Sequence, residues 1–545
     1  MKLLWILANP TYARNFEGAL RQLAAHGHEI VLAVEAGGVE EPGHPSLPAR
    51  LAEEYPNVTV EHAPAAERDH WAALRRGVAH AIDALRFEEP AYAGTPYLRT
   101  RAVYRTPLPY RKLLLPSLTE HAGRRRALRR TLRAVERAAP VSPATTAYLR
   151  AHKPDAMLVS PFVDFGAGQS RWIRSARAAG VRSCIAIYSW DALTVRGQIR
   201  EAPDLMTVWN QTQIDDAATL HEVPRERVVA TGAQAFDHWF KWSPSFTREA
   251  FCARVGLPAD RPFVLYLASS GGYVKGEVTW VLEWIERLRA SGHPELADAG
   301  VLVRPHPKTK DDWHAITRSG LDAVTVWPPL PGDGSTPIQL LDYSNASDQG
   351  KRELYDSIYH SAAVAGVNTS ALIESAIVGR PVHTVLDPRW SYAQGETLHF
   401  RQLVRVAGGA LEVGHDFDEH AAQLARSVAS GGESNGRSRG FLEAFIRPQG
   451  LETEATGRFV SVIEEFAAGP APAPAGRRLA DHVLRVALTP VAAGVALIPD
   501  DPQRWEWAAK RRRRRVRMLR RQAKRRWRVT RRRVGAVVYS ALGKR

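Results

Sequence analysis

Short apolar runs alternate along this chain with stretches in which apolar residues recur every three or four positions. Residues 3–8 and 30–34 are continuous apolar runs, and residues 12–26 between them carry apolar side chains at helical spacing. Runs of this length are typical of buried strands, whereas the wider spacing is typical of a helix with one buried face. The pattern predicts a strand–helix–strand unit, and therefore a parallel sheet covered by helices.

The same alternation continues in two series, joined by the connecting segment 242–260. We expect an α/β chain of two doubly wound, Rossmann-like domains, one over residues 1–240 and one over residues 241–466 that closes with a long helix, 441–466. The other predicted strands are 157–159, 184–187, 205–209 and 228–230 in the first domain, and 263–267, 301–303, 362–367 and 382–386 in the second.

Residues 66–140 interrupt the alternation with a helical, arginine-dense insertion in the first domain. Tyrosine and leucine side chains are interleaved with the arginines, which include the triplet Arg124–Arg126. Two interpretations stand side by side, a solvated helical excursion and a basic-aromatic surface that lies against a membrane.

The positive charge of the chain is concentrated at its carboxy-terminal end. A Pro/Ala-rich linker, residues 467–476, precedes a basic tail, residues 477–545. Residues 504–545 hold 19 Lys or Arg and one acid, Glu506, within a chain of net charge +17, so the body is close to neutral. A polybasic end of this kind binds anionic lipid or nucleic acid.

The side chains around these arginines favour the membrane. Tryptophans are interleaved with the basic residues of 504–533, and residues 479–498 before them form an apolar stretch. This stretch is broken by charges and a proline, so it is not predicted to span a bilayer. We expect peripheral binding to an anionic membrane surface through 504–545, and binding of RNA is the alternative that stays open.

The two cysteines, Cys184 and Cys252, argue against a disulfide framework and fit a reducing cytoplasm. The apolar run at the amino terminus stops at Asn9-Pro10, which favours a first strand over a signal peptide. No Cys/His or carboxylate cluster has metal-ligand spacing. We therefore expect no bound metal, and no cofactor other than a co-substrate.

Polar residues follow three strands predicted in the second domain. Neighbouring parallel strands end at the same edge of a sheet, so we expect these residues to lie close together. Basic side chains, a loop of small residues and the start of a helix at one edge predict a site for a diphosphate. The residues are Arg304, His306 and Lys308 after strand 301–303, Ser269, Ser270 and Gly271 after strand 263–267, and Asn368, Thr369 and Ser370 after strand 362–367.

From Arg304-Pro305-His306-Pro307 to the run 368–382, the chain resembles the donor half of GT-B glycosyltransferases. It is similar to bacterial surface-polysaccharide transferases and the CDP-glycerol glycerophosphotransferase group, and more distantly to UDP-N-acetylglucosamine 2-epimerases. The resemblance covers roughly residues 1–466. It implies that Ser269, Ser270 and Gly271 line the donor phosphates, that Arg304, His306 and Lys308 neutralise the leaving diphosphate, that Asn368, Thr369 and Ser370 donate hydrogen bonds to it, and that Glu374 accepts from the ribose hydroxyls.

Glycosyl transfer with inversion needs a base that takes the proton of the acceptor. Asp191, at the end of a predicted strand of the first domain, is the first candidate, with His28 and Asp164 behind it. His306 is the catalytic candidate on the side of the leaving diphosphate. GT-B enzymes typically need no metal, and the sequence does not distinguish retention from inversion.

These observations predict a cytoplasmic glycosyltransferase bound peripherally to the inner face of the plasma membrane. It would move a sugar from a nucleotide-activated donor to a lipid-linked or polymeric cell-surface glycan. Three alternatives remain: a CDP-glycerol-type glycerophosphotransferase, a UDP-sugar 2-epimerase, and a non-catalytic GT-B scaffold that binds membrane or RNA through its tail.

Overall fold

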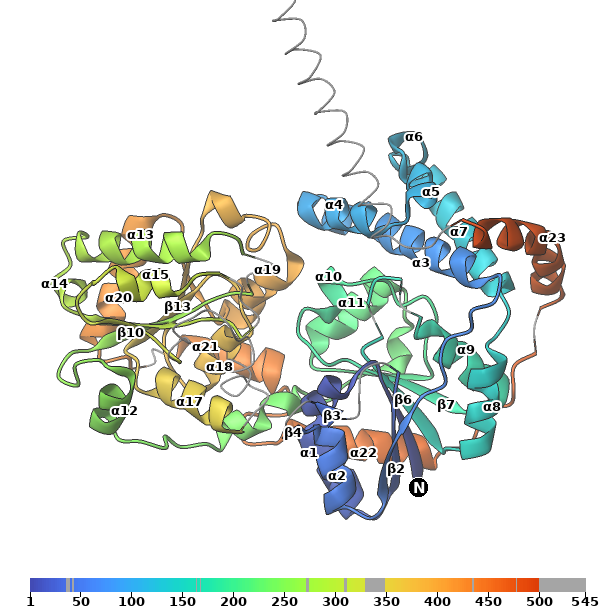
Figure 1. The fold of residues 1–545 in the computed structure, drawn as a ribbon, viewed down its shortest axis with the longest axis horizontal. Helices are drawn as coiled ribbons and strands as arrows, with labels where there is room; N and C mark the ends of the chain where they lie inside the picture. Colours follow the sequence, from blue (N-terminus) through green and yellow to red (C-terminus); the bar gives the residue numbers. More distant parts are fainter. Residues whose placement is uncertain are drawn as a thin grey trace, which may run out of the picture.

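The computed structural model contains two parallel β-sheets, each in its own lobe and each covered by helices on both faces (Figure 1). The predicted fold class, two doubly wound α/β domains, is therefore confirmed. The structure describes residues 1–35, 40–41, 44–162, 164–166, 168–270, 274–307, 311–328, 348–433, 436–476 and 478–498.

The amino-terminal sheet has seven parallel strands in the order β5-β2-β1-β6-β7-β8-β9. One of its inner strands, β1, is apolar at nearly every position and buried on both faces, as expected for a sheet between two layers of helices. The strands are β1 (Lys2–Leu7), β2 (Glu29–Val34), β5 (Val58–His62), β6 (Ala156–Ser160), β7 (Arg182–Ala186), β8 (Leu205–Val208) and β9 (Val228–Ala230). A short hairpin, β3 (Glu40–Glu41) and β4 (His44–Pro45), follows β2.

Helices and 3₁₀ turns connect successive parallel strands, as in a doubly wound domain. They include η1 (Pro10–Phe16), α1 (Glu17–Ala25), α2 (Leu47–Glu54), α8 (Pro143–His152), α9 (Ser170–Ala179), α10 (Ala192–Val195), α11 (Gln211–His221), η4 (Arg225–Arg227) and η5 (Gln234–Phe240).

The carboxy-terminal sheet has six parallel strands in the order β12-β11-β10-β13-β14-β15. The strands are β10 (Phe263–Leu267), β11 (Gly300–Arg304), β12 (Val324–Val326), β13 (Ala363–Gly366), β14 (Val382–Val385) and β15 (Glu412–Gly414). The helices are α12 (Arg248–Val255), α13 (Glu277–Arg289), α14 (Pro294–Ala297), α15 (His314–Arg318), α17 (Asp348–Tyr359), α18 (Ala371–Ile377), α19 (Leu398–Arg405) and α20 (Phe417–Ala429), with η6 (Pro388–Trp390) and η7 (Val406–Gly408).

The hydrophobic pattern did not predict three strands of the two parallel sheets, and all three lie at sheet edges. β5 closes one edge of the first sheet, and β12 and β15 close the two edges of the second. Each is only partly buried, so its sequence mixes apolar and polar residues. A continuous apolar run is typical of a strand with two neighbours, and these three strands have one. β9 is also an edge strand, but its sequence is apolar and it was predicted.

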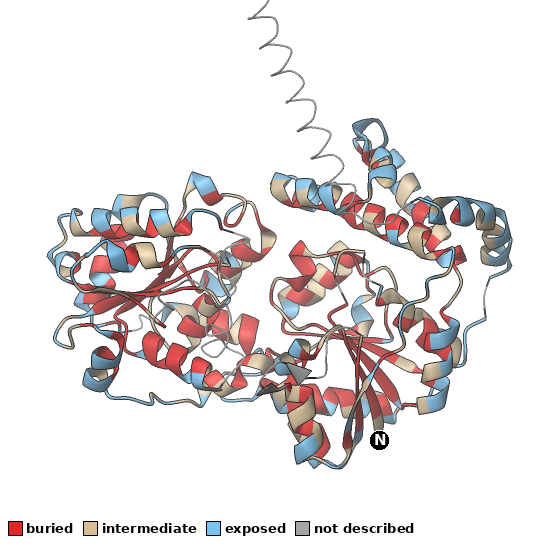
Figure 2. Cartoon of the chain, in the orientation of Figure 1, coloured by how far each residue is buried: buried red, intermediate tan, exposed pale blue. Residues whose placement is uncertain are grey.

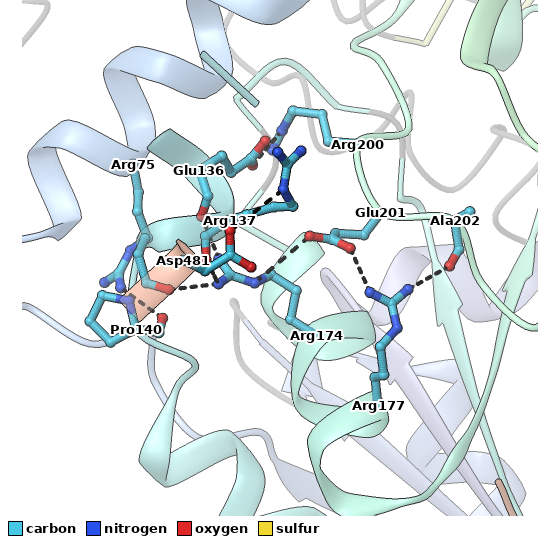
Figure 3. A network of polar contacts seen from close by, with 11 residues as sticks. Arg75, Glu136, Arg137, Pro140, Arg174, Arg177, Arg200, Glu201, Ala202 and Asp481 are labelled. Atoms are coloured by element: carbon cyan, nitrogen blue, oxygen red, sulfur yellow. Dashed lines mark hydrogen bonds and ion pairs between the residues drawn. The ribbon is translucent and has the colours of Figure 1, made fainter. Parts of the chain in front are cut away.

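The insertion forms a layer of helices with a hydrophobic core of its own. Figure 3 shows how polar side chains attach it to the amino-terminal domain. Arg200 lies 3.2 Å from Asp83 of α3 (Ala72–Arg86) and 2.8 Å from Glu136 of α7 (Ala122–Ala138), and all three side chains are buried. Arg174 of α9 donates to the carbonyls of Glu136 and Ala139 at 2.9 and 2.6 Å. The insertion comprises α3 (Ala72–Arg86), η2 (Pro90–Tyr92), α4 (Pro96–Arg105), α5 (Leu108–Arg111), η3 (Lys112–Leu114), α6 (Pro116–Thr119) and α7 (Ala122–Ala138).

The predicted single helix over 441–466 is wrong, because the chain crosses between the domains within it. Its parts are α21 (Arg437–Phe441), η8 (Leu442–Ile446) and α22 (Ala455–Ala468). Between η8 and α22, the guanidinium of Arg447 donates to the carboxylate of Asp237 at 2.7 Å, and Gly450 has a φ of +109°. Asp237 also accepts from the backbone nitrogen and hydroxyl of Thr456, both at 2.7 Å. The buried carboxylate thus ends one helix and begins the next.

The returning helix, α22, belongs structurally to the first domain, although the predicted second domain, 241–466, includes it. Phe459 and Ile463 are buried in the same core as Trp5 of β1. The residues after α22 run along the first domain, where Arg182 donates to the carbonyl of Pro470 at 2.8 Å. They lead to α23 (Leu479–Ala496), which packs on α7 and α3.

Candidate active site

In each sheet the early strands are added on one side of the first strand and the later strands on its other side. The place between the first strand and the first of these later strands is a topological switch point. In the carboxy-terminal sheet this point lies between β10 and β13, and in the amino-terminal sheet between β1 and β6. Ligands of open α/β sheets bind outside the carboxyl ends of the strands at such points. The residues that follow these four strands are therefore the candidate site.

The predicted donor-binding residues after β10 and β13 come together at this point. Ser269 is fully buried and its Oγ accepts a hydrogen bond from the backbone nitrogen of Asn368 at 3.4 Å. The Asn368 side chain is also buried, and its amide nitrogen lies 2.5 Å from the carbonyl oxygen of Ala393 and 3.2 Å from Nε2 of His399. The two predicted loops form one hydrogen-bonded unit at the strand ends.

A buried carboxylate that the sequence analysis did not identify supports this unit. Glu277, the first residue of α13, accepts from the backbone nitrogen of Ser269 at 3.0 Å and from the hydroxyl of Tyr266 at 2.9 Å. Burial raises the pKa of Glu277 to about 7. A first-turn glutamate is ordinarily a surface partner of the helix dipole. Only the loop that folds over Glu277 reveals its role.

The remaining predicted residues of this edge lie nearby. Ser270 and Thr369 are half-buried, Ser370 is exposed, and Glu374 is buried one turn into α18. The predicted helix start at Asn368–Ser370 is corrected slightly, because α18 begins at Ala371.

The loop after β11 contributes a half-buried His306 beside the end of β10, since β10 and β11 are neighbours. Two predicted donor-binding residues, Gly271 and Lys308, lie outside the described residues.

Arg304, at the end of β11, is directed toward α17. Its Nη1 donates to the carbonyl of Glu353 at 3.1 Å and to Oγ of Ser357 at 2.8 Å. Burial lowers the pKa of Arg304 to about 10, and the charges of Glu353 and Asp356 partly oppose this. Arg304 thus joins β11 to α17, and its contact with a donor diphosphate stays a prediction.

The carboxyl edge of the amino-terminal sheet carries a cluster of charged and phenolic groups. Asp164, after β6, forms an ion pair with Arg196 at 2.6 Å. Tyr12, after β1, and Tyr188, after β7, meet edge to face with ring centroids 5.1 Å apart. Burial raises the pKa of Tyr12, and the charge of Asp164 adds to this while that of Arg196 opposes it.

Asp191, the predicted base, lies between this cluster and the second domain. The hydroxyl of Ser189 donates to its carboxylate at 2.5 Å. The preceding residue, Trp190, donates from its indole nitrogen to Oγ of Ser370 at 3.0 Å, across the domain boundary. The Trp190 ring also meets the ring of His399 edge to face, with centroids 4.9 Å apart. These contacts bring the strand ends of the two sheets together.

His399, on α19, is a second residue of the site that the sequence analysis did not assign a role. It is buried, and burial lowers its pKa to about 4, against the opposing charge of Asp191. Nε2 faces the Asn368 amide, so the hydrogen-bond pattern assigns the ring proton to Nδ1. Nδ1 has no hydrogen-bond partner among the described residues. His399 is a neutral imidazole at the junction of the two edges.

His28, the weaker base candidate, lies at the opposite edge of the sheet. It precedes β2 and, with His26, contacts one carboxylate oxygen of Glu464 on α22, at 2.8 and 2.7 Å. These three side chains could hold a metal ion. They are remote from the strand ends that carry the candidate site, so His28 is not placed to act as its base.

Comparisons with known proteins give structural neighbours only. No protein-family model matches the sequence, and no curated protein matches it. The UDP-GlcNAc 2-epimerase from Methanocaldococcus jannaschii is 11% identical with a TM-score of 0.46, covering 85% of this chain and all of that one. A glycosyltransferase from Rickettsia africae is 10% identical with a TM-score of 0.46, covering 86% of this chain and 99% of that one. The UDP-GlcNAc 2-epimerase from Neisseria meningitidis, bound to UDP-GlcNAc, is 10% identical with a TM-score of 0.43, covering 85% of this chain and all of that one.

At these identities and TM-scores the likeness identifies neither a family nor a reaction for this chain. The architecture is plain from the chain itself. Two doubly wound parallel sheets meet through the ends of their strands, and a helix near the carboxyl end returns to the first domain. The protein has the GT-B-like, two-domain fold that its sequence predicts.

Proposed function

We propose that this protein is a sugar-nucleotide enzyme, and specifically a glycosyltransferase that uses a lipid-linked or polymeric glycan acceptor. The observation that supports this best is the joining of two different strand edges. One carries buried, neutral hydrogen-bonding groups around Ser269 and Asn368, and the other carries the ionisable groups around Asp191. The indole of Trp190 bonds Ser370 between them.

The edge of the second domain suits a nucleoside diphosphate. Backbone and hydroxyl groups of Ser270, Thr369 and Ser370 lie at the switch point, where phosphates bind in such sheets. Glu374, one turn further along, is the candidate acceptor of hydrogen bonds from the ribose hydroxyls. Because Glu277 and Asn368 hold the loops in place, little reorganisation is needed when the donor binds.

The edge of the first domain suits the acceptor and the chemistry. In an inverting transfer the acceptor oxygen forms a bond to the anomeric carbon while the bond from that carbon to the phosphate oxygen breaks. Asp191 takes the hydroxyl proton, and the nucleoside diphosphate leaves with the negative charge. His306 is the candidate for stabilising that charge from the side of β11.

The experiment is a thermal-shift screen of the full chain against UDP-, GDP-, CDP- and dTDP-linked donors. A ligand at a hundred times its Kd stabilises a protein by about 2.7 kcal/mol, which is a measurable shift. We expect one nucleotide class to stabilise the protein, and Glu374→Ala to abolish the shift. Glu286→Ala, an exposed substitution on α13, is the matched control and should leave the shift unchanged.

The outcomes separate the alternatives. Stabilisation by CDP-glycerol alone would indicate that the enzyme transfers a glycerol phosphate group and not a sugar. Conversion of a UDP-sugar without any acceptor would identify an epimerase. If no nucleotide stabilises the protein, the proposed function is wrong and a non-catalytic scaffold is favoured.

A further inference from the structure

Exposed apolar side chains are concentrated in one part of the molecule. Of thirteen large hydrophobic side chains that are exposed in the described chain, ten lie on the insertion or on residues 479–498. Figure 2 shows exposed positions along α23 and around α6, in contrast to the mostly buried sheets. The ten are Tyr104, Leu108, Leu115, Leu118, Leu479, Val483, Val486, Val491, Leu497 and Ile498.

The helix α23 has two faces with different roles. On the inner face Arg485 donates to the carbonyl of Ala138 at 2.8 Å, and Ala492 is fully buried in the core of the insertion. On the outer face Val483 and Val486 are 63% and 75% exposed. The inner face is enough to hold the helix on α7, so the outer face has no structural role in the described chain.

The tip of the insertion also exposes apolar side chains, and it is rich in basic residues. Leu108 on α5, Leu115 just before α6 and Leu118 on α6 are exposed, and Figure 1 shows these helices beyond α3 and α7, away from the sheet. Residues 96–138 hold twelve Lys or Arg and two acids. The exposed bases are Arg99, Arg105, Lys112, Arg124, Arg126, Arg130 and Arg137.

We propose that the outer face of α23 and the tip of the insertion form one docking surface for a lipid bilayer that contains anionic lipid. The apolar side chains enter the level of the acyl chains, and the arginines around them bind lipid phosphates. This docking surface consists of Leu108, Leu115, Leu118, Leu479, Val483, Val486 and Leu497.

The contacts of α23 favour a helix that lies on the membrane. Among the described residues it is the one helix long and apolar enough to cross a bilayer, by length and composition. Crossing would require Arg485 to leave Ala138 and Ala492 to leave its buried position. A helix fixed along one face to a domain in water presents its other face to the interface.

The chemistry of the surface favours lipid over RNA. RNA binds through phosphate contacts and the stacking of bases on aromatic or arginine side chains. Exposed valine and leucine side chains add nothing to such a complex, whereas they add directly to membrane binding. The 19 basic residues of 504–545 follow α23 in the sequence and add attraction to an anionic surface.

The docking surface deepens the proposed function, and it rests on that function only for the lipid-linked acceptor. Docking itself is measured without any donor. Failure of docking therefore leaves the nucleotide screen unaffected, and failure of the screen leaves docking unaffected.

The first experiment places an environment-sensitive dye on the surface in the full chain. Both native cysteines, Cys184 and Cys252, are buried, so Val483→Cys and Leu115→Cys can be labelled selectively. Phe246→Cys, an exposed site just before α12 of the second domain, is the control. With phosphatidylcholine vesicles that contain phosphatidylglycerol, we expect a blue shift at positions 483 and 115 and none at 246.

The labels distinguish the docking surface from attachment through the tail alone. If the protein binds vesicles but position 483 or 115 shows no blue shift, the single docking surface is wrong. If the wild-type chain binds an RNA oligonucleotide and no vesicles, the inference is also wrong.

The second experiment measures flotation with the same vesicles. Val483→Asp/Val486→Asp places two acids on the outer face, and we expect about tenfold weaker binding than for the wild type. Phe246→Asp/Tyr359→Asp adds the same charge at two other exposed apolar positions and should bind like the wild type. Equal flotation of all three proteins would overturn the docking surface, provided that their Tm values agree.

Discussion

The two strand edges that meet at the candidate site are built differently. At the edge of the second domain burial favours the neutral form of two groups beside the Ser269–Asn368 unit, since it raises the pKa of Glu277 to about 7 and lowers that of His399 to about 4. At the edge of the first domain Asp164 and Arg196 form an ion pair, and Asp191 is half-exposed. This difference fits the proposed function, in which one edge binds the donor and the other takes the proton of the acceptor.

Neutral hydrogen-bonding groups can bind a charged ligand without repelling its charge. A loop that is already fixed loses little conformational entropy on binding. A base, in contrast, must stay ionised and reach the acceptor, which requires partial exposure. Asp191 is partly exposed at the strand ends, whereas the carboxylate of Glu277 is buried under the Ser269 loop. The following predictions test this division from the largest expected effect to the smallest.

The largest effect should come from removing the base. Asp191→Asn keeps the size of the side chain but cannot take a proton, so we expect the transfer rate to fall by about 10²–10⁴-fold. Because Asp191 lies on the other domain, stabilisation by the nucleotide donor should be unchanged. Loss of donor binding together with the rate would contradict the division between the edges. Ser189→Ala, which removes the hydrogen bond to the carboxylate, should have a smaller effect on rate.

The ion pair between Asp237 and Arg447, where the chain crosses between the domains, can be removed by mutation. Asp237→Ala leaves the buried guanidinium of Arg447 without its carboxylate, and we expect a loss of about 3–5 kcal/mol in the free energy of unfolding. Chemical denaturation measures this. Arg447→Met in the same chain should recover part of the loss, because the unpaired charge is gone. If the single and double variants are equally unstable, the ion pair is not the cause.

The pH dependence of stability tests the neutral edge. Burial raises the pKa of Glu277 to about 7 from 4.5, so between these values the folded protein binds a proton that the unfolded chain has lost. The contribution of this group to the free energy of unfolding therefore falls as the pH rises, by roughly 3 kcal/mol over that range. Glu277→Gln should remove this slope in denaturation curves. A slope that persists in the variant would assign it to other groups.

The smallest effect concerns the contact between the edges. Trp190→Phe removes the hydrogen bond to Ser370 but keeps an aromatic ring, and we expect a cost of about 1 kcal/mol in stability. Ser370→Ala should have a similar effect, and the double variant should cost little more than either single one. Additive effects would show that the two side chains do not depend on each other.

The fold was accessible from the sequence because its inner strands are mostly apolar. β10 and the apolar edge strand β9 have the bounds predicted, whereas the edge strands β5, β12 and β15, whose sequences mix apolar and polar residues, were missed. The helix break after Arg447 was missed although Pro448 and Gly450 mark it in the sequence, and only the structure shows that Asp237, far earlier in the chain, holds the two ends of the break.

The candidate site was accessible only in part. The sequence by itself determined that Ser269, Asn368 and Asp191 follow strands, since strand ends and polar turns are local features. Only the tertiary structure decided that Arg304 bonds to α17, that Glu277 is buried under the Ser269 loop, and that Trp190 reaches Ser370. The direction and burial of a side chain depend on residues far away in the chain, and the local pattern does not contain them.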